Sequence, residues 1–150
     1  GHSIGQIGVV TEDNVLFCGD AFFSEEKMEK YPFPFVFDVG AHLKTLEFLL
    51  GTNYDCYMIS HCDGPLDNPK SVIQKNIDNI KTNLQIMLDF LSQPLTREDL
   101  TELIIKKYDI AMNLSQYFIT ITSVAAFLTY LLEKELINMD IIDGKMYFYA

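Results

Sequence analysis

The sequence is short of cysteine and of basic residues, and each shortage excludes classes of protein. Its three cysteines are an odd number without Cys-x-x-Cys spacing, so they indicate neither a disulfide framework nor a zinc knuckle, and we expect a reducing, cytoplasmic location. Eleven Lys and Arg against 21 Asp and Glu give a formal charge of -10, which argues against binding to nucleic acid or to an anionic membrane surface. No signal peptide opens the chain, and the longest apolar run, 124–132, is too short to cross a membrane.

Apolar residues make up 49% of the 150 residues, which is enough for a core in one ordinary domain or two small ones. Short β-rich runs at 7–10 and 15–18 flank turn-forming residues and predict a hairpin. A long loop with one helical turn is expected over 22–35, where four phenylalanines either shape a pocket or bury themselves under the loop. A third strand is predicted over 54–60, and Asp63-Gly64-Pro65 ends it.

Helical periodicity marks two segments of this part of the chain. Apolar residues over 40–50 predict a helix, and His42 on it is expected to be a surface histidine or one that orients a ligand, because no matched donor lies one turn away. A longer amphipathic helix is predicted up to about residue 90, with Asn68 as its N-cap. Its apolar stripe indicates a helix that faces a core and not a cofactor.

A second unit is predicted over 93–150, after a first domain over 1–92. Thr96 opens it with a capping pattern, and Asp143-Gly144 between two β-rich runs is a strong hairpin signal. Three helices are expected, over 97–107, 114–118 and 122–135. Three helices and a hairpin in this order resemble a winged helix.

A winged helix would invite an interpretation as a DNA-binding unit, which needs basic side chains on its third helix. Residues 122–132 offer none, and residues 95–150 carry five basic and eight acidic residues. Packing onto a neighbouring unit or a second subunit is therefore favoured over nucleic-acid recognition.

Three polar side chains stand where strands of the first part begin or end. His2 lies in a glycine-rich stretch before the first strand, Asp20 follows the second strand, and His61 follows the third. Singly, each has a plainer interpretation: His2 as a tag remnant, Asp20 as a turn or cap residue, His61 as a hydrogen-bonded strand-end histidine. Together, imidazole and carboxylate donors at neighbouring strand ends indicate a site for zinc, iron or manganese.

These stretches resemble motifs of the metallo-β-lactamase-fold hydrolases. Gly1-His2-Ser3-Ile4-Gly5-Gln6-Ile7-Gly8 is similar to their Gly-His-Thr-Pro-Gly-Ser-Ile-Gly motif, Phe17-Cys18-Gly19-Asp20 to their Gly-Asp motif, and Ser60-His61 to their final Gly-His-Gly histidine. The resemblance covers residues 1 to about 65. The leading His-x-His-x-Asp-His signature, which supplies about half of the family's metal ligands, is absent, and Cys62 stands where the family has glycine.

The resemblance implies the C-terminal half of an αββα metallo-β-lactamase-like sandwich, of the α/β (α+β) class, followed by a small winged-helix-like unit. It also implies a hydrolase in which a metal-bound hydroxide attacks an ester, thioester, lactone or phosphodiester. Asp20 would bridge two ions, and His2 and His61 would each bind one. Because each ion would then receive only two donors, we expect weak metal binding and no catalysis by this segment alone.

A function of another class is also open. The long helix and the second unit would bury their apolar faces against another copy, in a non-catalytic assembly or dimerisation module. A half-fold exposes a sheet edge and core surface that favour such a homo-oligomer.

Overall fold

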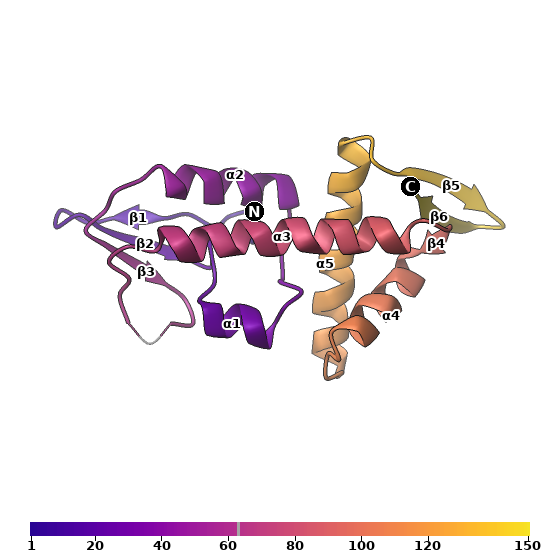
Figure 1. The fold of residues 1–150 in the computed structure, drawn as a ribbon, viewed down its shortest axis with the longest axis horizontal. Coiled ribbons are helices and arrows are strands. Elements are labelled where there is room, and N and C mark those ends of the chain that lie inside the picture. Colours follow the sequence, from indigo (N-terminus) through magenta and orange to yellow (C-terminus); the bar gives the residue numbers. More distant parts are fainter. Residues whose placement is uncertain (63) are drawn as a thin grey trace.

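The computed structural model describes residues 1–62 and 64–150, so the break predicted at Asp63 lies outside the described residues. The elements in chain order are β1 (Val9–Val10), β2 (Val15–Gly19), α1 (Glu25–Lys30), α2 (Val39–Leu50), β3 (Cys56–Ile59), α3 (Lys70–Phe90), β4 (Leu95–Thr96), α4 (Arg97–Lys107), α5 (Leu114–Glu133), β5 (Asn138–Ile142) and β6 (Lys145–Tyr149). This mixture confirms the predicted α/β (α+β) class. Figure 1 shows α3 lying along the molecule, with one small sheet toward each of its ends.

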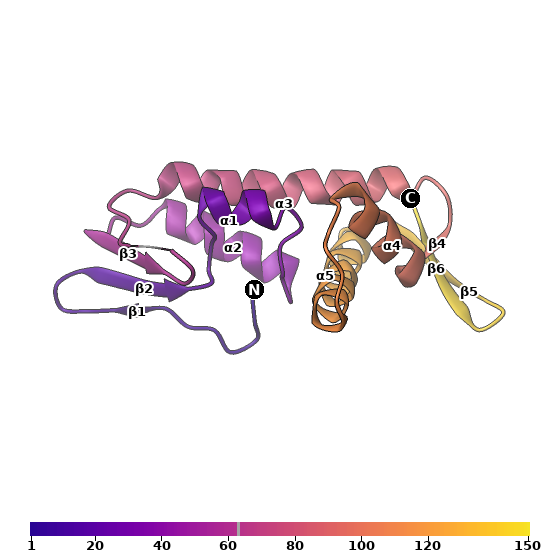
Figure 2. The ribbon, with the colours of Figure 1, turned by 90° about the horizontal axis from the view of Figure 1, so that it is seen from below.

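The first sheet has the strand order β1-β2-β3. β1 pairs antiparallel with β2, with Val9 opposite Phe17, which confirms the predicted hairpin. β2 pairs in parallel with β3, and the connection between them runs through α1 and α2. Leu16 and Cys18 of β2 are buried in one cluster with residues of α2 and α3, whereas Phe17 between them is exposed. The helices therefore cover one face of this sheet, as Figure 2 shows from a second direction.

The starts of α2 and α3 differ in how they are capped. The Asp38 side chain accepts a hydrogen bond from Ala41 N at 2.8 Å and caps α2. The predicted cap at Asn68 is wrong, because Pro69 takes the N-cap position of α3 and no side chain caps this helix. Proline suits a helix start because it has no N–H group to leave without a partner.

Residues 114–133 form one helix, α5, where two helices were expected. The β-branched run 119–122 weakens helix propensity, but two of its hydroxyls are used within the helix. Thr120 Oγ1 donates to Gln116 O and Thr122 Oγ1 donates to Phe118 O. Residues 93–150 thus hold two helices and the antiparallel sheet β4-β6-β5, so the winged-helix-like arrangement of three helices is not confirmed.

α5 has a further property that the apolar run in the sequence did not show. Among the described residues, it is the one helix long and apolar enough to span a bilayer by length and composition. The core helix of a soluble protein meets the same criterion. Part of α5 faces the protein interior, since Phe127 and Leu131 on it are fully buried.

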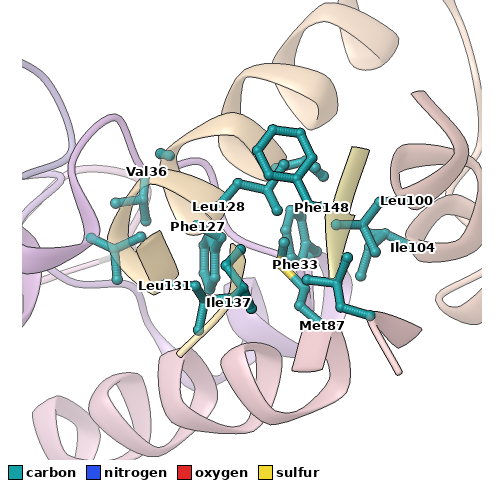
Figure 3. Packing of buried hydrophobic residues seen from close by; sticks show 14 of the residues in the cluster. Phe33, Val36, Met87, Leu100, Ile104, Phe127, Leu128, Leu131, Ile137 and Phe148 are labelled. Atoms are coloured by element: carbon teal, nitrogen blue, oxygen red, sulfur yellow. The ribbon is translucent and has the colours of Figure 1, made fainter. Parts of the chain in front are cut away.

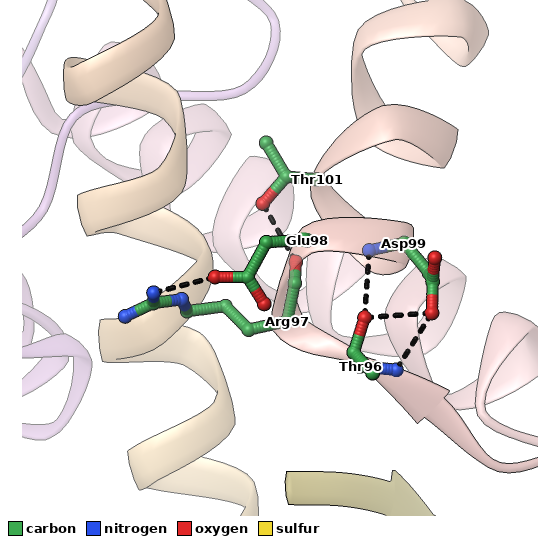
Figure 4. A network of polar contacts seen from close by, with 5 residues as sticks. All are labelled: Thr96, Arg97, Glu98, Asp99 and Thr101. Carbon is green, nitrogen blue, oxygen red and sulfur yellow. Dashed lines mark hydrogen bonds and ion pairs between the residues drawn. The ribbon is translucent and has the colours of Figure 1, made fainter. Parts of the chain in front are cut away.

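A capping box begins α4, as predicted from Thr96. Thr96 Oγ1 accepts from Asp99 N, and Asp99 Oδ2 accepts from Thr96 N, both at 3.1 Å. Beside it, Thr101 Oγ1 donates to Arg97 O at 2.8 Å, and the Arg97 guanidinium pairs with Glu98 at 2.6 Å. Figure 4 shows this network where β4 passes into α4.

The core consists of two clusters that meet along α3. The first lies between the first sheet and its helices and includes Leu16, Phe22, Leu46, Tyr57 and Ile73. The second, drawn in Figure 3, includes Phe33, Met87, Leu100, Phe127 and Phe148. Since Phe33 comes from the long aromatic loop and Phe127 from α5, this cluster joins segments far apart in the sequence. The expected border between residues 92 and 93 stays a prediction.

Asn76 of α3 holds the start of the aromatic loop. Its side chain accepts from Phe23 N at 2.9 Å and donates to Phe23 O at 2.8 Å. We expect Asn76→Leu to lower the free energy of unfolding by about 2–4 kcal/mol, because two backbone groups of Phe23 lose their partner. Urea denaturation measures this change. Gln74→Leu on the exposed side of α3 is the control, and an equal effect of both substitutions would contradict this role of Asn76.

Candidate metal centre

The carboxylate of Asp20 lies between two imidazoles. His2 Nε2 is 3.8 Å from Asp20 Oδ2, and His61 Nε2 is 3.6 Å from Asp20 Oδ1. The structure therefore brings together all three residues predicted as metal ligands, with each histidine facing a different oxygen. Both separations are longer than a hydrogen bond. Within residues 1–62 and 64–150, however, no three His, Cys, Asp or Glu side chains are arranged to hold one ion.

The parallel pairing of β2 and β3 places two of these residues at one edge of the sheet. Asp20 directly follows β2, His61 follows β3 by two positions, and Ser60 N donates to Gly19 O at 2.8 Å between them. Gly19 has a φ of +55°, which side-chain-bearing residues adopt only at a cost. The chain thus turns sharply as it leaves β2 and directs Asp20 toward His61.

His2 reaches the site from the segment before β1, not from a strand end. Gly1 O accepts hydrogen bonds from Phe37 N at 3.0 Å and Asp38 N at 2.9 Å, which ties the segment to the start of α2. A Cβ on Gly1 would lie 2.2 Å from His42 Cα, so only glycine fits so close to the helix. His2 Nδ1 then lies 3.2 Å from Phe35 O. Donation to this carbonyl leaves the lone pair on Nε2, which faces Asp20.

The surroundings of His2 keep its imidazole in the form that binds metals. Burial lowers the pKa of His2 below its ordinary value, while Asp20 and the hydrogen bond to Phe35 O act in the opposite direction. The ring also lies edge-on to Phe23 and Phe35, with centroids 5.9 Å and 5.1 Å away. A neutral, immobilised imidazole is ready to donate its Nε2 lone pair.

The phenylalanines of the aromatic loop take both roles that the sequence left open, burial under the loop and the shaping of a pocket. Phe22 is buried in the core, Phe23 and Phe35 line a cavity of about 300 Å³ that also contains His2, Asp20 and His61, and buried Phe33 belongs to both the core and the cavity wall. Sequence reasoning missed Phe35 O as the partner of His2, and it missed Gln116 and Ile119 of α5, which line the same cavity. No motif marks these positions.

His42 is buried, with 1% of its surface exposed, so the expectation of a surface histidine is wrong. It lies under Gly1, and its Nδ1 has no hydrogen-bond partner in the part of the chain that the structure describes. Burial is the main cause that lowers its pKa to about 4. It makes no ion pair with Asp20, whose two partners among the described residues are His2 and His61.

Known structures share this architecture. A metallo-beta-lactamase family protein from Thermus thermophilus matches all of this chain with a TM-score of 0.77 and 19% identity, over 47% of its own length. A beta-lactamase domain protein from Burkholderia ambifaria matches all of it with a TM-score of 0.70 and 14% identity, over 45% of its length. No protein-family model and no curated protein sequence matches.

These likenesses show the fold. The chain is a segment of the metallo-β-lactamase fold, and it spans about half the length of the solved structures that it matches. The resemblance seen in the motifs around His2, Asp20 and His61 is thereby confirmed at the level of the fold. The roles of these three residues as metal ligands stay a prediction.

Buried His42 makes the stability of the chain depend on pH. Between its ordinary pKa of 6.5 and its folded-state pKa of about 4, the unfolded chain takes up a proton that the folded chain does not. The free energy of unfolding is therefore retained above pH 6.5 and falls by up to about 3 kcal/mol as the pH drops toward 4.

Urea unfolding near pH 7.5 and pH 5 measures this dependence. We expect the difference between the two pH values to be smaller in His42→Leu than in the original chain by about 2 kcal/mol. Other titrating groups contribute to both proteins and cancel in the comparison. Equal differences in the two proteins would show that His42 does not cause the effect.

Proposed function

We propose that this chain supplies one side of the two-metal centre of a metal-dependent hydrolase. In this proposal Asp20 bridges two ions, while His2 binds one and His61 binds the other. The observation that supports it is the placement of the two histidines at opposite oxygens of one carboxylate. When bound, such ions supply a hydroxide nucleophile and polarise the bond that it attacks.

The three side chains fit ions of this kind. Asp20 Oδ1 is buried and has no hydrogen-bond partner within residues 1–62 and 64–150, which is costly for a carboxylate unless another group neutralises it. The separations of 3.6 Å and 3.8 Å are shorter than two metal bonds of about 2.0–2.2 Å placed end to end, so an ion can reach both donors of each pair. Imidazole and carboxylate together suit zinc, iron or manganese.

This chain supplies and orients two donors for each ion, and the remaining ligands of each ion come from other groups. The Phe35 carbonyl fixes the tautomer and orientation of His2, and the turns at Gly19 and His61 aim the other two donors. Two donors for each ion are fewer than the three or four of a stable site. We therefore infer that the segment alone is inactive and that further donors come from a longer, cytoplasmic protein that cleaves an ester, thioester, lactone or phosphodiester.

Calorimetric titration with zinc tests the proposed ligands. We expect weak binding, with a Kd of about micromolar or higher, because each ion has two donors. Asp20→Asn is expected to weaken binding about tenfold or more, because it removes the charge that both ions share. Glu47→Gln, an exposed acid on α2, is the matched control and should bind as the original chain does.

Two outcomes of this titration would count against the proposal. Binding that is unchanged in Asp20→Asn would remove Asp20 from the site. A nanomolar site for two ions in the original chain would show that this segment already carries a complete centre.

An assembly role is a second candidate, and the first sheet favours it. Three apolar residues on it and on the segment before it are exposed by about half or more: Ile7, Val9 and Phe17. Val9 and Phe17 lie directly opposite each other on β1 and β2. An apolar sheet face of this kind is covered in stable proteins. We propose that a second copy covers it when this segment is alone.

Light scattering measures the mass that this role predicts. We expect the original chain to form a dimer or larger assembly, and Phe17→Asp to shift it toward a monomer because a charge enters the apolar contact. Phe118→Asp changes an exposed phenylalanine on α5, away from the first sheet, and should leave the assembly intact. A monomeric original chain would rule out this role.

A further inference from the structure

The cavity beside the candidate metal centre is lined by both halves of the chain. Its lining includes His2, Asp20 and His61 and residues of the aromatic loop. Gln116 and Ile119, one turn apart on α5, complete the lining. Residues from both sides of the expected domain border therefore line this cavity, and α5 supplies those from the second unit.

The α5 wall is held firmly in place. Ser123, on the same face of the helix as Ile119, is 1% exposed, and its hydroxyl accepts a hydrogen bond from Val36 N at 3.4 Å. One turn further along, Phe127 packs on Phe33 with ring centroids 5.0 Å apart. These contacts fix α5 against the end of the aromatic loop, so Gln116 and Ile119 have a defined position at the cavity.

The walls offer apolar surface and little positive charge. Phe23, Phe33, Phe35 and Ile119 present rings and an aliphatic side chain, and Gln116 adds one uncharged amide. Lys27 is the one cationic side chain among the described lining residues, and its Nζ lies 4.9 Å from the Tyr31 ring. With one cationic side chain on the walls outside the proposed metal ligands and a net charge of -10 on the chain, a polyanionic substrate is disfavoured.

We propose that this cavity binds a compact aryl group attached through a short linker to the carbonyl of an ester or thioester, and that Ile119 and Gln116 determine which aryl group fits. The proposal rests on the proposed hydrolase function and narrows its substrates away from phosphodiesters of nucleic acids. A cavity of about 300 Å³ is at the small end for ligand sites, which suits one ring and its linker.

The test uses the metal-free chain with 13C-labelled isoleucine methyl groups and a stable amide in place of the ester. Titration with 3-phenylpropionamide is expected to shift the Ile119 methyl signal with a Kd of about millimolar, whereas propionamide, which lacks the ring, is expected to give no saturable shift. Ile141, an exposed residue of β5, is the distant reporter and should not move.

Ile119→Ala is expected to weaken binding of the aryl amide about fivefold or more, followed through the remaining isoleucine and aromatic signals. The residue is 42% exposed, so the variant is expected to fold, and Ile141→Ala is the matched control. Absence of a saturable Ile119 shift, or equal affinity in Ile119→Ala, would overturn the proposal. Because no metal is present, such a failure leaves the zinc titration of Asp20→Asn to decide the hydrolase function by itself.

Discussion

Both ends of the molecule depend on the buried face of α3. Over its 21 residues it contributes to both core clusters, through Ile73 and Ile77 in one and Ile80 and Met87 in the other. Its side-chain amides extend this role, since Asn76 pairs with the backbone of Phe23 and Asn83 donates to Pro32 O at 2.9 Å. The loop that walls the candidate site is thus attached to α3 at two points.

Most of the structure that could be predicted from the sequence was predicted from local sequence patterns. Apolar periodicity located α2 and α3, and turn residues located the β1–β2 hairpin, because these signals depend on neighbours in the chain. The approach of Asp20 to His61 was also predictable, since adjacent parallel strands end at the same sheet edge. His2 was predicted from its place next to the first strand and from the motif resemblance, and in the structure it reaches the site from the segment before β1.

The rest is set by contacts between distant segments, which no local pattern records. His42 is buried because Gly1 lies directly on α2, and the sequence around His42 carries no sign of that contact. α5 continues through a β-branched run because Thr120 and Thr122 bond back to the preceding turn. Gln116 reaches the cavity only because the second core cluster fixes α5 against the aromatic loop.

Backbone conformation at this sheet edge is also unusual. His61 has a φ of +59°, which is uncommon for residues with a side chain although histidine, asparagine and aspartate adopt it more often than the others, and Gly19 across the parallel pair has +55°. Asn14, Asp109, Glu135 and Asp143 also have a positive φ elsewhere in the chain, so the conformation alone does not identify a site. At His61 it directs an imidazole toward Asp20, whose buried Oδ1 has no hydrogen-bond partner among the described residues. A histidine in the left-handed region beside a buried carboxylate oxygen that no hydrogen bond of the described residues satisfies is expected of a site built to bind something, and stability alone does not require it.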